Sequence, residues 1–211
     1  MRLKTLGQLA LSQGDLTQAQ RFLEETVTMC TSINLRPPLY EAQPLLGLVT
    51  LYHGDVPAAR QLLEESWRLC VQSKNKVFAA RACAYRAEFA LWEGDVEQAA
   101  HWLAQSLDHQ MTPDRFAIFQ VGRLFLAARL ATAQQQYRRA ATLFGLAEQA
   151  HSRIHYVING PMRALADEAR ATVQLVLEPA VFAEAFAAGR QMELAEALPG
   201  LLAPSSIGFQ E

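Results

Sequence analysis

The sequence predicts an all-α fold, an α-solenoid of about four helix pairs followed by C-terminal capping helices. The first observation is a phrase that recurs at a constant interval, as GDLTQA at 14–19, GDVPAA at 54–59 and GDVEQA at 94–99. The second is that helix-favouring residues dominate the 211-residue chain, while β-branched residues rarely alternate with polar ones. Self-similarity at a fixed period of this size is typical of solenoids, which are usually built to bind and not to catalyse.

A third observation is that each phrase belongs to a longer pattern. A degraded fourth copy, QQYRRA at 135–140, follows the third after nearly the same interval. A bulky apolar residue follows each phrase by four positions: Leu23, Leu63, Leu103 and Phe144. Small residues lie seven positions before and five after the start of each phrase: Gly7 and Ala19, Gly47 and Ala59, Ala87 and Ala99, Ala128 and Ala140. Small residues at these positions let two antiparallel helices approach closely, and the bulky side chains fill the groove between them.

The first helix pair is expected within residues 1–36. Its first helix is predicted over about 2–13, and its second helix follows the turn at Gly14 and ends at about residue 34. Gly14 can adopt the left-handed conformation that ends a helix, and the Asp15 carboxylate can cap the next helix. The same Gly-Asp device recurs at 54–55 and 94–95. Pro37 and Pro38 are expected to break the chain after the first pair, because proline cannot continue a helix.

The next three pairs are expected within 37–75, 76–111 and 112–152. Their helices are predicted near 39–53 and 56–73, 77–93 and 96–109, and from Pro113 to about 133 and 136–152. Capping helices are predicted within 153–198, near 162–177, 180–188 and 192–198, with a break at Pro179 and an irregular tail over 199–211. Phe182, Phe186 and Leu198 are expected to cover the exposed apolar face of the last pair.

Composition argues against several classes of protein. The chain carries 19 basic and 21 acidic residues, a formal net charge of −2, which gives no general attraction to nucleic acid or to a membrane. No apolar run is long enough to span a bilayer, and the first residues do not form a signal peptide, so we expect a cytoplasmic protein. Cys30 and Cys70 occupy the same position of successive repeats and are expected to be packing residues.

The sequence gives no positive sign of an enzyme, a cofactor or a metal site. The phosphate-binding patterns GxxxxGK[ST] and GxGxxG are absent. His151 and His155 have i, i+4 spacing but lack the acidic residue of an HExxH pattern. The adjacent glutamates at 24–25 and 64–65 are expected on solvated helix faces.

The repeated pattern resembles the tetratricopeptide repeat (TPR). The shared features are a small residue before the turn, Gly-Asp at the turn, alanine after it, and then leucine or phenylalanine. The standard repeat has about 34 residues, whereas this period is longer. Longer helices of this kind resemble the TPR-like superhelix of the maltose-regulator type, and this resemblance implies a right-handed superhelix.

The C-terminal third carries a more specific resemblance. The phrases AATLFGLAE at 140–148, GPMR at 160–163, FAEAFAAGRQM at 182–192 and LAEAL at 194–198 resemble the C-terminal region of large bacterial ATP-dependent transcriptional regulators. That family joins such a region to a STAND-type ATPase and often to a LuxR-type output domain. The resemblance covers essentially the whole chain and implies a sensor or interaction region, with no direct contact to nucleic acid.

In TPR arrays the first helix of each pair lines the concave face. Carried over by position, this predicts a partner-binding set: Glu41, Tyr52, Arg81, Tyr85, Glu88, Trp92, Phe125 and Arg129. Leu48 and Leu51 lie on the same helix face and are better explained as core between repeats. Aromatic anchors with isolated charges suit a protein or peptide partner, or a small-molecule inducer. The alternative is a stand-alone TPR adaptor, although the start of the chain inside a helix favours a fragment or a missing upstream repeat.

Overall fold

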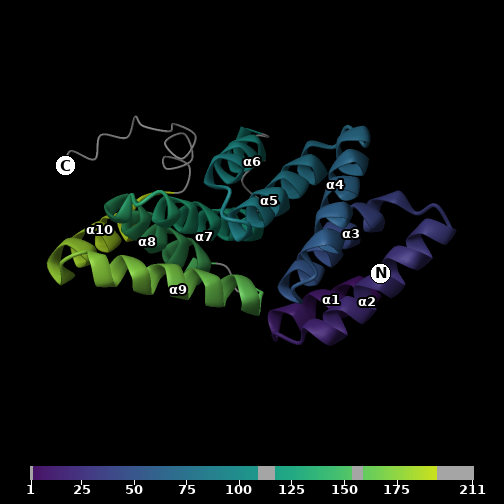
Figure 1. Ribbon diagram of the computed structural model, residues 1–211, viewed down its shortest axis with the longest axis horizontal. Helices are drawn as coiled ribbons and strands as arrows, with labels where there is room; N and C mark the ends of the chain where they lie inside the picture. Colours follow the sequence, from purple (N-terminus) through teal and green to yellow (C-terminus); the bar gives the residue numbers. More distant parts are fainter. Residues whose placement is uncertain (1, 109–116, 154–158, 194–211) are drawn as a thin grey trace.

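The computed structural model describes residues 2–108, 117–153 and 159–193, and within these ranges every regular element is a helix (Figure 1). The helices are α1 (Arg2–Ser12), α2 (Leu16–Ser32), α3 (Arg36–Tyr52), α4 (Val56–Gln72), α5 (Lys76–Trp92), α6 (Val96–Asp108), α7 (Ala117–Ala133), α8 (Tyr137–Arg153), α9 (Gly160–Val176) and α10 (Pro179–Gln191). The predicted all-α class is confirmed. The expected helix start at Pro113, His155, the expected capping residue Leu198 and the expected tail lie outside the described residues.

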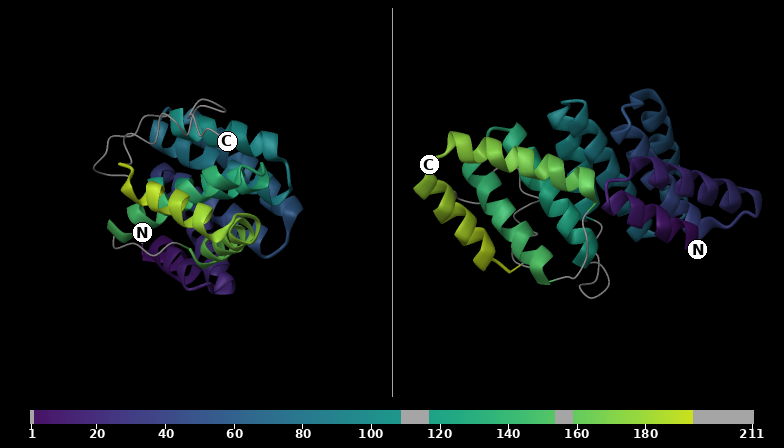
Figure 2. Two further views of the ribbon diagram at one scale, coloured as in Figure 1. Left: turned by 90° about the vertical axis from the view of Figure 1, so that its left-hand side faces the viewer. Right: turned by 90° about the horizontal axis from the view of Figure 1, so that it is seen from below.

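The first eight helices form four successive pairs. Each odd-numbered helix packs against the next one along the chain, in the pairs α1–α2, α3–α4, α5–α6 and α7–α8. The first helices also contact one another in the order α1, α3, α5, α7 (Figures 1 and 2). All of the predicted partner-binding residues belong to this row of first helices.

The turns inside the pairs confirm the Gly-Asp prediction. Gly14, Gly54 and Gly94 have φ values of 78°, 89° and 79°, in the left-handed region where glycine carries no steric penalty. In the fourth pair Gln135 adopts the same conformation with φ of 61°. The aspartate of each Gly-Asp turn caps the following helix. The carboxylates of Asp15, Asp55 and Asp95 accept the backbone N–H of Gln18, Ala58 and Gln98, respectively, at 3.0–3.1 Å.

The connection between the first two pairs differs from the prediction. Pro37 and Pro38 do not separate the pairs but lie in the first turn of α3, which begins at Arg36. The backbone N–H groups of a first turn have no partner inside the helix, so a proline, which lacks this N–H, removes no helical hydrogen bond there. The chain reverses instead at Asn34, which has φ of 53°, and Lys74 does the same after α4 with φ of 55°.

The predicted small-to-large packing forms the core of each pair. Ala19, Ala59, Ala99 and Ala140 are buried, as are the bulky residues that follow them: Leu23, Leu63, Leu103 and Phe144. At Gly47 an added Cβ would lie 2.8 Å from Cγ of Leu63, which is closer than side-chain contacts allow. The helices of this pair therefore approach as closely as a glycine permits.

Helices α9 and α10 do not form a fifth pair of the same kind. α10 packs chiefly against α8, and the Phe182 and Phe186 rings stack with centroids 5.6 Å apart and cover the core at α7 and α8. α9 packs on α7 and α8, and its first residue returns to the turn after α1, where a Cβ on Gly160 would lie 3.3 Å from Cα of Gly14. Contacts therefore run from α1 through α3, α5 and α7 to α9 and back to α1 (Figure 2).

α10 continues to Gln191, beyond the predicted end at 188, because Gly189 does not end the helix but packs within it against the backbone of α8. The short helix predicted over 192–198 does not include its first two residues, and the remainder lies outside the described part of the chain. None of the described helices combines the length and apolar character needed to cross a membrane.

Candidate functional site

A polar cluster joins the C-terminal halves of the first helices α3, α5 and α7. Arg129 of α7 donates from Nη1 to both carboxylate oxygens of Glu88 on α5, at 2.6 and 2.7 Å. The Tyr52 hydroxyl of α3 donates to the same carboxylate over a long 3.5 Å. Trp92 lies beside this group, with its ring tilted against that of Tyr52 and 6.0 Å between centroids. Four residues of the predicted set thus come together, and we call them the inner-face cluster.

Burial divides the inner-face cluster into support and surface. Glu88 is 0% exposed and Arg129 is 7% exposed, so their opposite charges compensate each other inside the protein. Burial raises the pKa of Tyr52 well above its usual value, and the negative charge of Glu88 raises it further. Trp92 is 39% exposed, which makes it the member of the cluster that a partner can reach.

A second polar group joins the N-terminal halves of the first helices. The Glu41 carboxylate of α3 pairs with Lys4 of α1, and it lies 3.9 Å from Nη1 of Arg81 on α5. All three side chains are partly exposed, so water screens the attraction and each pair stabilises the fold by at most about 1 kcal/mol. The group still places one acidic and two basic side chains across three neighbouring helices.

Residues at equivalent positions of successive repeats are neighbours in this row. Glu41 and Arg81 are separated by one period of the repeat, as are Tyr52 and Trp92, and Glu88 and Arg129 are separated by the slightly longer interval between the last two pairs. The two members of each couple are in contact in the structure. This pairing was not predicted from the sequence, although opposite charges at one position of adjacent repeats could have indicated it.

The remaining members of the predicted set contribute to the core. Tyr85 is partly buried between α3 and α5. Phe125 is 1% exposed and lies under α9, with the Arg163 guanidinium 5.5 Å from its ring centroid. Leu48 and Leu51 are fully buried, in agreement with their expected core role.

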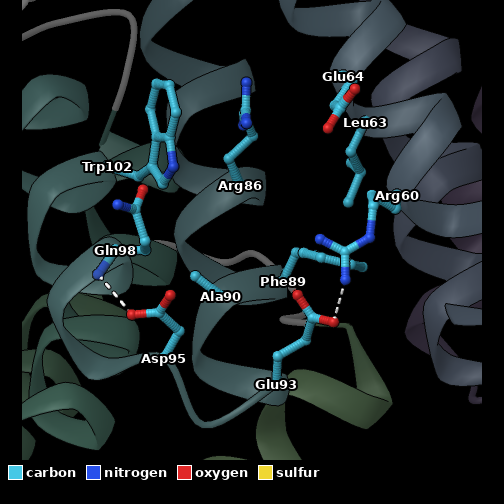
Figure 3. A pocket seen from close by; sticks show the side chains of 10 residues that line it. All are labelled: Arg60, Leu63, Glu64, Arg86, Phe89, Ala90, Glu93, Asp95, Gln98 and Trp102. Atoms are coloured by element: carbon cyan, nitrogen blue, oxygen red, sulfur yellow. Dashed lines mark hydrogen bonds and ion pairs between the residues drawn. The ribbon is translucent and has the colours of Figure 1, made fainter. Parts of the chain in front are cut away.

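A separate cavity of about 240 Å³ opens between α4, α5 and α6 (Figure 3). Its lining residues are Arg60, Leu63, Glu64, Arg86, Phe89, Ala90, Glu93, Asp95, Gln98 and Trp102. The Arg86 guanidinium lies beside two indole rings, 4.0 Å from the centroid of Trp102 and 5.1 Å from that of Trp67, and these two rings pack edge-on against each other with centroids 5.5 Å apart. Arg60 pairs with Glu93 and lies over the Phe89 ring. This cavity was not predicted from the sequence, because its lining comes from three different helices.

The described residues include no group of three or more His, Cys, Asp or Glu side chains arranged to hold a metal ion. Comparisons with protein-family models, with curated proteins and with solved structures find no match to this chain.

Proposed function

We propose that the chain is a non-catalytic, TPR-like interaction and sensor domain that binds a protein partner or an inducer on the row of first helices. The observation that carries this proposal is Trp92, an exposed aromatic side chain that packs on the partly buried Tyr52, which in turn contacts the buried pair Glu88 and Arg129. Exposed aromatic anchors held in place by packed neighbours dominate the energy of many interfaces. Partly exposed charges at Glu41 and Arg81 add selectivity at the other end of the row.

The same arrangement suggests how binding is transmitted. The inner-face cluster ties α3, α5 and α7 together, and α9 joins α7 back to α1. In this proposal the helices exchange between two spacings. A ligand that binds one spacing more tightly than the other shifts the equilibrium toward the spacing that it prefers. A coupling of about 1–3 kcal/mol is typical of such linkage.

The resemblance of the C-terminal phrases supports a specific context. In this proposal the chain is the C-terminal regulatory part of a bacterial signal-transduction ATPase or LuxR-type transcriptional regulator. The size of the native polypeptide tests this context, by immunoblotting a lysate of the source cells with an antibody against the chain. A band several-fold heavier than 23.4 kDa supports it, whereas a band near 23.4 kDa favours the stand-alone adaptor.

Substitution of Trp92 tests the binding surface. Proteins retained from the source lysate by the immobilised wild-type chain are compared by mass spectrometry with those retained by Trp92→Ala and Val71→Ala. Val71 is a matched control, since it is an exposed apolar residue of α4 outside the row of first helices. Partner loss with Trp92→Ala alone supports the inner face, and equal retention by all three proteins overturns it.

A further inference from the structure

The first helix pair carries an apolar face that is open in the described part of the chain. Leu6 and Leu9 of α1 are 41% and 52% exposed, and Phe22 of α2 is half-buried. The residues one period later pack in a single cluster with the core of the first pair, and they are Leu46, Val49 and Leu62. The face that joins the second pair to the pair before it is therefore exposed on the first pair.

The last helix pair does not offer a matching open face. α10 packs chiefly on α8, with Ala185 and Phe186 against the core of this pair, and α9 packs on both α7 and α8. Because α9 and α10 cover the last pair, a second copy of the chain cannot stack on it head to tail. The open faces of two copies can only meet each other, and such an isologous contact closes at two copies around a twofold axis.

The exposed side of α1 is complementary to itself when two copies lie antiparallel. Arg2, Leu6, Leu9 and Gln13 follow at intervals of four, three and four residues, which places them on one stripe of the helix. Gln13 continues this stripe because its N–H still bonds to the Leu9 carbonyl at 3.1 Å. The spacing is the same in both directions. Two antiparallel stripes therefore bring Leu6 of each copy to Leu9 of the other, and Arg2 opposite Gln13.

The charges at the two ends of α1 favour the same orientation. Arg2 is exposed in the first turn of α1, and Asp15 is exposed just beyond its last turn. The antiparallel arrangement brings each Arg2 to the C-terminal end of the other α1, where the free carbonyl groups and Asp15 carry negative charge. A parallel arrangement would instead bring the two Arg2 side chains together.

We propose that the chain forms a symmetric homodimer in which the exposed stripes of two α1 helices pack antiparallel. Leu6 and Leu9 of both copies form the apolar centre of the interface, Phe22 lies on the same face, and Arg2 pairs with the C-terminal end of the opposite helix. The rows of first helices of the two copies then meet at α1. The proposal does not depend on the inner-face cluster, because α1 contributes no residue to it.

The mass of the full chain in solution tests the dimer, by size-exclusion chromatography with light scattering over a series of concentrations. The wild type should reach twice 23.4 kDa. Leu9→Glu brings two carboxylates into the interface and should weaken association about tenfold or more. Leu175→Glu is the matched control, since it adds the same charge at an 87% exposed leucine of α9 and should leave the dimer intact. A monomeric wild type, which would leave the face to a helix of another protein, or a dimeric Leu9→Glu would overturn the proposal.

A charge exchange tests the antiparallel orientation with substitutions at exposed positions. Arg2→Glu should weaken association severalfold, because it places a carboxylate at the negative end of the opposite helix. Adding Gln13→Arg to this variant should restore the dimer. The two positions are about 16 Å apart along one helix, so the restored contact must form between copies. Circular dichroism should show equal helix content in both variants. A double variant that associates as weakly as Arg2→Glu alone would contradict the proposed interface.

Discussion

Glu88 and Arg129 stand at the same position of successive helix pairs and form a buried ion pair across α5 and α7. One guanidinium nitrogen of Arg129 donates to both oxygens of Glu88, and the Tyr52 hydroxyl reaches the same carboxylate. At this position the second pair carries Leu48, which is fully buried. The third and fourth pairs thus carry charged residues where the second pair carries an apolar one. Each of the two buried charges is compensated by the other.

Removing one partner of this pair should cost far more than removing both. Arg129→Leu leaves Glu88 buried without its counter-charge, and the free energy of unfolding should fall by about 3–5 kcal/mol. The double variant Glu88→Leu with Arg129→Leu should recover most of that loss, because leucine already fills this position in the second pair. Urea unfolding followed by circular dichroism measures both changes. A double variant as unstable as the single one would contradict this explanation.

The contact between α8 and α10 should tolerate no side chain at its two glycines. A Cβ on Gly145 would lie 2.0 Å from the carbonyl oxygen of Phe186, and one on Gly189 would lie 1.9 Å from that of Thr142. Both obstacles are main chain, so the helices must separate, and Gly145→Ala or Gly189→Ala should destabilise the fold by about 3 kcal/mol or more.

Gly122 provides the matched control for this contact. A Cβ there would lie 3.7 Å from Sδ of Met162, an ordinary van der Waals distance. Gly122→Ala should therefore raise stability by up to about 1 kcal/mol, because alanine favours the helix more than glycine does. Thermal denaturation of the three variants side by side checks the difference, and equal effects would refute it.

The stability of the protein should decline as pH rises above the usual tyrosine pKa of about 10. Burial, helped by the charge of Glu88, raises the pKa of Tyr52 in the folded state. Above pH 10 the unfolded chain therefore loses this proton while the folded protein keeps it, which favours unfolding. Below that pH the contribution is fully present.

Tyr52→Phe isolates this effect. Its free energy of unfolding should fall less between pH 8 and pH 11 than that of the wild type, and the two native proteins should give the same tyrosinate absorbance near pH 10. A full extra tyrosinate signal from the native wild type at that pH would show that Tyr52 ionises normally.

The cysteines should react slowly with thiol reagents while the protein is folded. Burial raises the pKa of Cys70 to about 12 and that of Cys83 to about 11, and Cys30 is also buried. The thiolate is the reactive form, so at pH 8 the native protein should react much more slowly than the unfolded chain. Ellman's reagent with and without denaturant measures the two rates. Rapid, stoichiometric labelling of the native protein would contradict the burial of these thiols.

The sequence alone determined the helical class, the period and the turns inside the pairs. These features depend on neighbouring residues, such as Gly54 ending one helix and Asp55 capping the next, so a local pattern suffices to predict them. The buried alanines and leucines were predictable for the same reason, since their positions recur with the same period as the turns. The turns between the pairs were predicted less well, because a proline can either end a helix or begin one.

The tertiary structure decided what depends on residues far apart in the chain. It places Arg86 beside Trp67 and Trp102, and it brings Gly160 back against Gly14, which lies in the turn between α1 and α2. It also separates the exposed Trp92 from the buried charges beneath it. No local pattern specifies these relationships, because they arise from the stacking of successive pairs and from the path of α9. Both depend on packing between helices that are distant in the chain.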